Sequence, residues 1–380
     1  METKKEGFPA AFWVCACTEI FERLAYYLGR SLILIFVTAS VATGGLGLSD
    51  TVAANMQSNL TAFSYLLPLF GAVIVDKYIG ARYTTPVGMF IAAAGYFTGG
   101  IAKSSAGVYA MIFLVSLGLA LFKNGAIIGR VITDKSQMDP AFSMRYTLVN
   151  VGAFIGTFLV GILYKDVFAK DGVLGFAPCF KMAALMMVLG GLWYIFVCWR
   201  FLGDLGKLPF KKTLTEEEKA AEAKKKEETG TKQPLTTIEK KRIGAIFVAS
   251  LFSIVFWIFW YLGYMPVYFY WAENMDWVVA GYQVPSTWFD AANSLFCVIL
   301  GPVTAALWKK LAARPQGDMS LFRKTGLGIA IIGVGYLFYA AIDIMRGGEK
   351  ASVLWLIVFA FLLTMGEMFF SPLGLSLIHI

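Results

Sequence analysis

Four charged side chains lie inside the first long apolar stretch of the sequence, which runs from about residue 12 to residue 41. They are Glu19, Glu22, Arg23 and Arg30. A charge at the centre of a bilayer costs a few kcal/mol even on lenient scales, so an ionisable residue there indicates a functional site. Protonation of a carboxylate that is paired with an arginine removes the attraction between them. The chemistry that these residues predict is the binding and release of a proton.

Helical spacing places these side chains on one face, because residues three or four apart in a helix are neighbours. The stripe has six members: Glu19, Glu22, Arg23, Tyr26, Tyr27 and Arg30. We interpret it as the lining of a polar cavity in which the carboxylates hold Arg23 and release it when they are protonated. The alternative is a buried ion pair that only fixes the packing of this helix.

The elements that must position the stripe are membrane helices. Of the 380 residues 58% are hydrophobic and 15% are charged, whereas soluble domains are about half apolar and a quarter charged. Apolar segments long enough for a bilayer core of ~30 Å number ten. They are residues 12–41, 54–75, 83–101, 107–129, 142–164, 177–202, 243–271, 286–308, 325–345 and 352–376. The sequence predicts an all-α polytopic membrane protein.

Charge divides the chain into three parts. We expect an N-terminal six-helix bundle over residues 1–203, a charged cytoplasmic linker over 204–242 and a C-terminal bundle over 243–380. With the N-terminus in the cytoplasm, most of the 33 Lys and Arg residues fall on the inner side, as the positive-inside rule requires. The net charge of +8 therefore indicates membrane topology and not nucleic-acid binding.

Motifs for chemistry on a substrate are missing from the sequence. The five cysteines form no CxxC pair and there is one histidine, which argues against a zinc or disulfide framework. No HExxH, GxSxG or P-loop pattern occurs. We therefore expect neither an enzyme nor a cofactor or metal site, and the proton gradient is the expected energy source.

Three further features stand out within apolar segments. Lys123 is too far from a helix end to reach the interface easily, so we expect a carboxylate partner, with Glu19 and Glu22 available. Gly152 and Gly156 form a small-x-x-x-small surface for close helix packing. Glu367 is a lone carboxylate, and no Lys or Arg lies within the last four apolar segments to neutralise it. A substrate ammonium could supply that charge.

The run E-x-x-E-R-x-x-Y-Y-x-x-R at residues 19–30 resembles the first-helix signature of the proton-dependent oligopeptide transporter (POT/PTR) family of the major facilitator superfamily. Similar matches occur in order at residues 71–82, 121–125, 142–156, 285–293 and 366–376. The resemblance implies two helical bundles around a midplane cavity and twelve helices in all. The chain stops soon after the tenth, so we expect a C-terminally truncated sequence with two helices missing.

The resemblance also implies roles for particular residues. Those expected to couple the proton are Glu19, Glu22 and Arg23, to which we add Asp290. Those expected to bind substrate are Tyr26, Tyr27, Arg30, Tyr65, Lys123, Asn150, Trp257, Asn293, Glu367 and Ser371. Those expected to serve gating are Asp76, in a loop signature of the superfamily, and Pro372, which loosens its helix.

Two departures from the family pattern bear on coupling. The Pro that commonly follows Lys123 is replaced by Asn124, and Tyr261 stands where the family usually has a Glu of the seventh helix. We hypothesise that Asp290, where relatives have an uncharged amide, takes over the task of that acid. An interfacial Asp near a helix start is the alternative.

The function that follows is proton-coupled symport of di- and tripeptides by alternating access. The expected partners are a small peptide, protons and the lipid bilayer, and we expect a monomer in the cell membrane. Two alternatives stay open. One is transport of another small solute, such as nitrate or an amino-acid derivative, and the other is an uncoupled or non-transporting relative.

Overall fold

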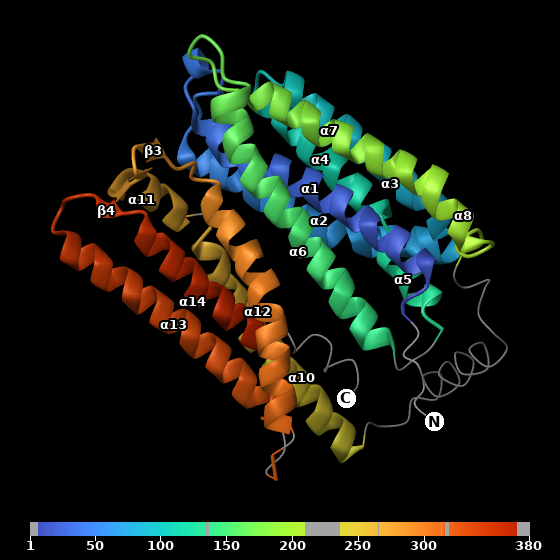
Figure 1. The fold of residues 1–380 in the computed structure, drawn as a ribbon. Coiled ribbons are helices and arrows are strands. Elements are labelled where there is room, and N and C mark those ends of the chain that lie inside the picture. The colour runs from blue at the N-terminus through green and yellow to red at the C-terminus, as the bar shows by residue number, and fades with distance from the viewer. Residues whose placement is uncertain are drawn as a thin grey trace. The chain divides into compact units, whose positions relative to one another are not determined.

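The structure is a computed structural model that describes residues 7–133, 137–209, 236–264, 266–312, 314–315 and 319–370. The described chain is built almost entirely of helices (Figure 1). It divides into two compact units, Met1–Thr215 and Glu216–Ile380. Most of the linker expected over residues 204–242 falls on residues 210–235, which lie outside the described part.

The first unit contains six helical stretches, three of them composite. They are α1 (Ala10–Thr38), α2 (Asp50–Lys77), α3 (Ala81–Ile101), α4 (Ser105–Leu121) with α5 (Asn124–Val131), α6 (Met138–Ile162) with the π-helical turn η3 (Leu163–Val167), and α7 (Phe176–Trp193) with the π-helical turn η4 (Tyr194–Cys198) and α8 (Trp199–Leu202). The short 3-10 turn η1 (Val41–Thr43) follows α1. These stretches coincide with the first six predicted segments.

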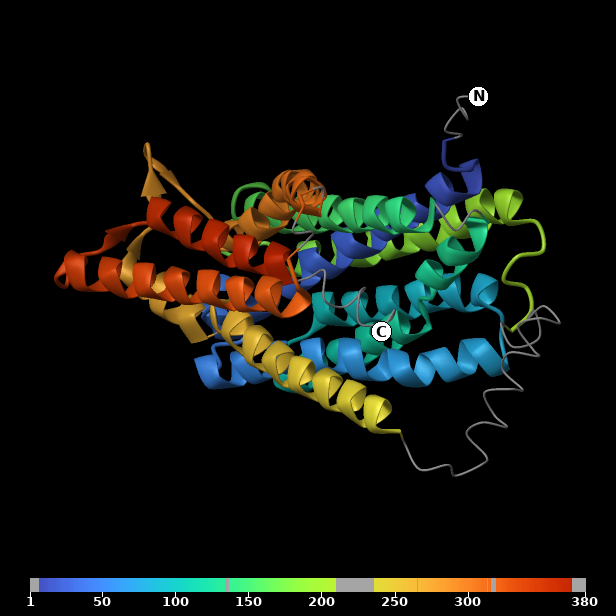
Figure 2. The same cartoon turned by 90° about the horizontal axis from the view of Figure 1, so that it is seen from below.

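Helix α1 is the central element of this unit, because it packs against α2, α5, α6 and α7. Helix α3 packs against α4 and α7, and α3 and α7 run side by side in both Figure 1 and Figure 2. Glycines allow close approach at two places in the motif at residues 71–82. A Cβ at Gly71 would collide with the backbone of Ala120, and one at Gly80 would collide with the backbone of Gly206. Both positions therefore require glycine.

The small-x-x-x-small surface of α6 packs directly against the backbone of α1. A Cβ at Gly152 would lie 2.9 Å from the Ile20 carbonyl oxygen, and a Cβ at Gly156 would lie 2.5 Å from that of Leu24. The close helix packing predicted from these two glycines is confirmed. It brings the side chains of α6 that flank Gly152 within reach of the charged stripe of α1.

We predict that Gly156→Ala lowers the stability of the protein while Gly333→Ala does not. A Cβ at Gly156 meets the backbone of Leu24, whereas a Cβ at Gly333 on α13 meets nothing within 4 Å. Overpacking of this kind costs about 1–3 kcal/mol, and an unhindered Gly→Ala change in a helix gains about 0.5–1 kcal/mol. Thermal unfolding of the detergent-solubilised variants checks this. Equal shifts for both would contradict it.

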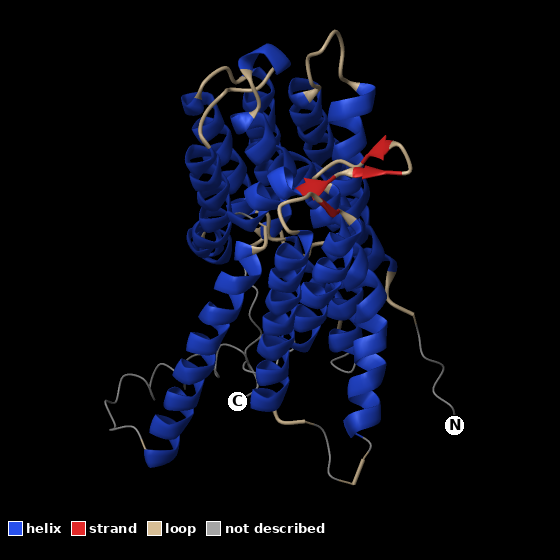
Figure 3. Cartoon of the chain, turned by 90° about the vertical axis from the view of Figure 1, so that its left-hand side faces the viewer, coloured by secondary structure: helices blue, strands red, loops and turns tan. Residues whose placement is uncertain are grey.

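The second unit contains α10 (Thr237–Leu262), α11 (Pro266–Asn274), α12 (Trp288–Ala312), α13 (Leu321–Arg346) and α14 (Leu354–Phe370). The loops of its described part contain four strands of two residues each: β1 (Met275–Asp276), β2 (Val278–Val279), β3 (Tyr282–Gln283) and β4 (Ala351–Ser352). Strand β1 pairs in parallel with β4, and β2 pairs antiparallel with β3. Figure 3 shows these strands in red within the helical structure.

The seventh predicted segment is divided into α10 and α11. Pro266 has no amide hydrogen to continue the helical hydrogen bonds, so α11 begins anew there. In the middle of α11 the Tyr270 hydroxyl donates to Asp343, which also forms an ion pair with Arg346 at 2.7 Å. Arg346 in turn donates to the Tyr270 oxygen at 2.8 Å. This triad fixes α11 to α13.

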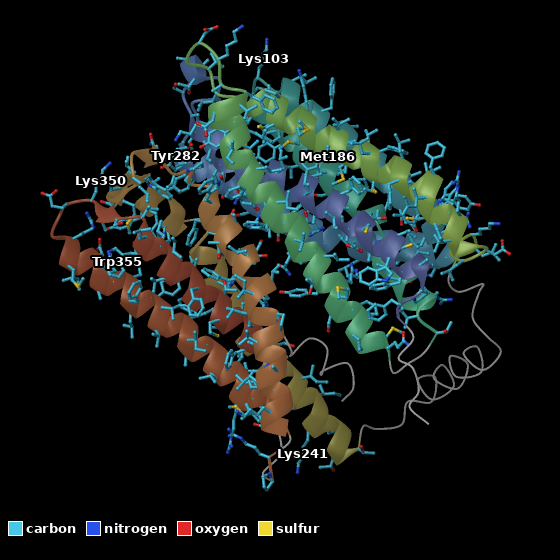
Figure 4. The ribbon with its side chains drawn as sticks, viewed as in Figure 1. Lys103, Met186, Lys241, Tyr282, Lys350 and Trp355 are labelled. Atoms are coloured by element: carbon cyan, nitrogen blue, oxygen red, sulfur yellow. The ribbon has the colours of Figure 1, made fainter. Side chains whose placement is uncertain are left out.

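Seven helical stretches among the described residues are long and apolar enough to cross a membrane. The three other predicted segments form helices that fall short of this for different reasons. Helix α1 carries four charged residues, α3 contains Arg, Thr, Tyr, Pro and Gly residues that lower its hydropathy, and α14 has 17 residues. Figure 4 places Lys241, near the start of α10, and Lys350, before α14, at opposite ends of the second unit.

Candidate functional site

The first ion pair of the site joins two sequence neighbours on α1. Arg23 donates to Glu22 through two nitrogens, with Nη2 lying 2.6 Å from Oε1. The Glu22 side chain is fully buried, whereas that of Arg23 is 27% exposed. The expectation that both carboxylates hold Arg23 is wrong, since the partner of Glu19 is a different cation. The two acids of the stripe therefore have separate environments.

Glu19 is bound by side chains from two other helices. Its Oε1 accepts hydrogen bonds from Arg145 Nε of α6 and from Asn124 Nδ2 of α5, both at 3.0 Å. Asn124 also donates to the Cys15 carbonyl oxygen at 2.8 Å. Glu19 thus joins α1, α5 and α6.

Sequence reasoning assigned no role to Arg145, although a signal for it exists. Arg145 precedes Gly152 by seven residues and so lies on the same face of α6. Because Gly152 marks the surface that packs on α1, the face that it shares with Arg145 is directed at the acidic stripe.

Lys123 does not have the carboxylate partner that we expected. It is the residue before α5, in the break after α4, and its Nζ donates to the Pro68 carbonyl oxygen of α2 at 2.9 Å. Asp76, near the end of α2, is close enough to interact with it electrostatically. The backbone break at Phe122 and Lys123 turns the ammonium toward α2 and leaves Glu19 to Asn124 and Arg145.

Aromatic rings accompany the arginines of the stripe. The Arg23 guanidinium lies 5.0 Å from the centre of the Tyr26 ring, and that of Arg30 lies 5.7 Å from the centre of the Tyr27 ring. Arg30 is buried. The two tyrosine rings meet edge to face at 5.4 Å. The helix thus places its cations over aromatic faces, an arrangement worth about 0.5–2 kcal/mol per pair.

Two other predicted residues of the first unit are Tyr65 and Asn150. Tyr65 of α2 is exposed and interacts electrostatically with Tyr27. Asn150 of α6 donates from Nδ2 to the Tyr146 carbonyl oxygen at 3.0 Å, one turn earlier in the same helix. Tyr146 and Asn150 share a face, as their spacing predicts.

The second unit holds a buried carboxylate next to an amide. Glu367 of α14 is 8% exposed, and its Oε2 accepts a hydrogen bond from Asn293 Nδ2 of α12 at 3.0 Å. The same nitrogen of Asn293 lies 2.9 Å from Thr364 Oγ1. Within the described residues Glu367 has no Lys or Arg partner. We expected both Asn293 and Glu367 to bind substrate, and the structure places them in contact. Nothing in the sequence indicated Thr364.

An aromatic cluster lies beside this carboxylate on α10 and α14. Phe256 stacks on Phe370 at 3.8 Å, and Trp257 packs edge to face against Phe256 at 5.3 Å. Tyr261 lies against Trp257, with ring centres 6.0 Å apart. Tyr261, where the resemblance implied an acid, is therefore part of an aromatic surface.

Asp290 lies in the first turn of α12, half-buried, where a helix N-terminus favours a negative charge. Its neighbour Phe289 packs against Tyr264, just after the end of α10, with ring centres 5.0 Å apart. Asp290 is thus near the break between α10 and α11. The predicted residues Ser371 and Pro372 lie outside the described residues.

The two clusters differ in what they can do. The carboxylates of α1 are paired with arginines, so a proton that binds there competes with an ion pair. The carboxylate of α14 is buried with an amide and a hydroxyl, so it can accept a cationic group from a ligand. No group of three or more possible metal ligands occurs in the ranges that the structure describes.

Comparison with known proteins gives consistent results. The model of the POT family matches residues 206–379. An uncharacterized transporter of Bacillus subtilis, YclF, is 25% identical over 411 residues, which cover 97% of this chain and 81% of YclF. A di-/tripeptide transporter of Lactococcus lactis subsp. cremoris is 24% identical over 422 residues, which cover 97% of this chain and 83% of that protein.

Solved structures of the same family share the fold. A crystal structure of a mutant POT peptide transporter in complex with alafosfalin is 25% identical, with a TM-score of 0.82 over 98% of this chain and 83% of that one. A POT family transporter in complex with 5-aminolevulinic acid is 23% identical, with a TM-score of 0.84 over 98% of this chain and 85% of that one. The fold is that of a multi-pass membrane transporter.

Proposed function

Because the chain belongs to the POT family of transporters, we propose that it is a proton-coupled symporter of di- and tripeptides that works by alternating access. Membership makes it a transporter and not an enzyme. The remaining expectations also belong to the proposal: the two bundles are those over residues 1–203 and 243–380, the protein is a monomer in the cell membrane, and its N-terminus is cytoplasmic.

The observation that carries the coupling proposal is the buried Glu22–Arg23 pair. Glu22 is fully buried, and both of its oxygens accept hydrogen bonds from Arg23. A buried ion pair depends strongly on the presence of both charges, so protonation of Glu22 frees Arg23 for other contacts. The partial exposure of the Arg23 side chain gives it room to move. Proton binding at Glu22 therefore changes the charge presented by α1.

A zwitterionic peptide requires cations at one end and an acid at the other. Arg30 and Lys123, with Asn150, are proposed to bind its carboxylate. Glu367, with Asn293, is proposed to bind its ammonium. The proposed aromatic contacts are Tyr26, Tyr27, Tyr65 and Trp257, with Ser371 as a further contact, and the proposed gating residues are Asp76 and Pro372.

The test is uptake of a labelled dipeptide into proteoliposomes, with and without an inward proton gradient. Accumulation that requires the gradient supports symport. Exchange without accumulation would show a carrier that is not coupled to protons. Absence of dipeptide binding and exchange would contradict the peptide substrate.

A second candidate is transport of an amino-acid derivative. It is favoured by the aromatic replacement at Tyr261 and by the POT family structure that holds 5-aminolevulinic acid. Counterflow competition separates the two: dipeptides displace the labelled solute more strongly than single amino acids if the first proposal holds, and less strongly if the second does.

We predict that Asp290→Asn reduces proton-driven uptake several-fold while exchange of the solute persists. Asp290 lies near the break between α10 and α11, beside Phe289 and its contact Tyr264, and could carry the proton that Tyr261 cannot. The measurement compares uptake driven by a gradient with counterflow in the same proteoliposomes. Intact gradient-driven uptake in Asp290→Asn would show that this residue only stabilises the N-terminus of α12 and does not couple the proton.

A further inference from the structure

Glu19 and Glu22 lie three residues apart on α1, yet they are held in different ways. Glu19 is 2% exposed and is bound from outside its own helix, by Arg145 of α6 and Asn124 of α5. Glu22 is bound by its sequence neighbour Arg23. One carboxylate thus links three helices, and the other belongs to a pair that is confined to one.

We propose that Arg145 is a positioning residue that keeps Glu19 ionised, so that Glu22 is the single carboxylate of α1 that exchanges protons during transport. The inference rests on the proposed function, because it assigns different roles in proton coupling to Glu19 and Glu22. The sequence alone predicted the same role for both.

The contacts of Glu19 depend on its negative charge. Arg145 Nε and Asn124 Nδ2 both donate to the same oxygen of Glu19. Hydrogen bonds to a carboxylate favour the charged form, and so does a cation within about 4–6 Å. Protonation would weaken both bonds and would leave the Arg145 charge without its acid. The attachment of α5 and α6 to α1 would weaken with it.

The contacts of Glu22 allow protonation at a smaller structural cost. Arg23 lies on the same helix, its side chain is partly exposed, and its guanidinium already lies over the Tyr26 ring at 5.0 Å. When Glu22 is neutral, Arg23 keeps that aromatic contact and can turn toward another anion. Both hydrogen bonds between Arg23 and Glu22 lie within α1.

The shape of α5 allows Arg145 to reach Glu19. A Cβ at Gly125 would lie 3.0 Å from Arg145 Cζ, so the glycine leaves the space that the guanidinium occupies. Lys123, two residues earlier, is held by the Pro68 carbonyl and does not compete. The break between α4 and α5 thus leaves Glu19 accessible to Arg145 and directs Lys123 elsewhere.

Other titratable groups face the two acids. The Cys15 thiol on α1 interacts electrostatically with Glu19 and also with the Cys198 thiol on η4. Tyr96 of α3 interacts electrostatically with Glu22, and Arg145 acts on Glu22 as well as on Glu19. Removal of Arg145 therefore affects both acids. Only a comparison with Glu19→Gln separates the two effects.

The test uses the pH dependence of thermal unfolding of the whole detergent-solubilised protein, which needs no transported solute. In Arg145→Gln a buried Glu19 without its cation takes up a proton on folding, so the unfolding temperature falls as the pH rises from about 5 to about 8. The double variant Glu19→Gln with Arg145→Gln lacks this fall. Arg145→Lys keeps the wild-type pH dependence, as does the control Arg323→Gln at an exposed site.

The same variants in proteoliposomes test the role in coupling. Glu19→Gln is expected to keep the pH profile of solute exchange, whereas Glu22→Gln loses it. Loss of the profile in Glu19→Gln, or an Arg145→Gln variant with the wild-type pH dependence of unfolding, would overturn the proposal. Failure of every variant and of the wild type to exchange dipeptide would instead contradict the proposed substrate, and the unfolding data would still decide the role of Arg145.

Discussion

Replacement of Glu22 by Gln is expected to abolish accumulation of dipeptide against its gradient while exchange of dipeptide across the membrane continues. Gln has the shape of a protonated Glu and cannot release a proton, so the variant stays in the state in which Arg23 is free. For one proton per peptide, a pH difference of one unit supplies about 1.4 kcal/mol, which corresponds to about tenfold accumulation. The variant is expected to reach equal concentrations inside and outside.

The measurement is the steady-state ratio of labelled dipeptide in proteoliposomes at a fixed pH difference, together with counterflow at equal pH. Glu273→Gln is a matched control, because Glu273 is exposed in α11 and has no predicted role. The control should keep the wild-type ratio. Accumulation in Glu22→Gln equal to that of the control would refute the assignment of the coupling proton to Glu22.

Replacement of Glu367 by Gln is expected to weaken dipeptide binding by about 100-fold. The carboxylate is buried on α14, and its hydrogen-bond donors in the described part of the chain, Asn293 and Cys297, are neutral. The ammonium of a substrate is therefore its proposed counter-charge. A hydrogen bond to a charged group contributes about 1.5–3 kcal/mol, and about 3 kcal/mol corresponds to a factor of about 100 in affinity. Gln keeps the size of the side chain and its contact with Asn293, so the effect reports the lost charge.

Equilibrium binding of a dipeptide and of its N-acetylated form tests this assignment. The acetylated peptide has no ammonium, so it is expected to bind the wild type weakly and to lose little further affinity in Glu367→Gln. A variant that loses affinity equally for both peptides would show that Glu367 supports the packing of α12 and α14 and does not bind the amino end.

Much of the fold follows from the sequence, because the signals are local. A long apolar run predicts a membrane helix without reference to the rest of the chain, and the described residues of all ten predicted segments are mostly helical. The sequence also predicted the close packing at Gly152 and Gly156, since that prediction depends only on helical spacing. The break after Leu262 has a local cause as well, in Pro266, although the sequence reading treated residues 243–271 as one helix.

What the sequence by itself determined about the candidate site is which residues carry charge inside apolar helices and which share a helical face. Only the tertiary structure decided their partners. Glu19 is bound by Arg145 and not by Arg23, and Lys123 turns to the Pro68 carbonyl, because the α4–α5 break and the glycine surface of α6 set which side chains meet. Helical periodicity acts within one helix, whereas an ion pair between helices depends on their distance and rotation, which the packing of the whole unit determines.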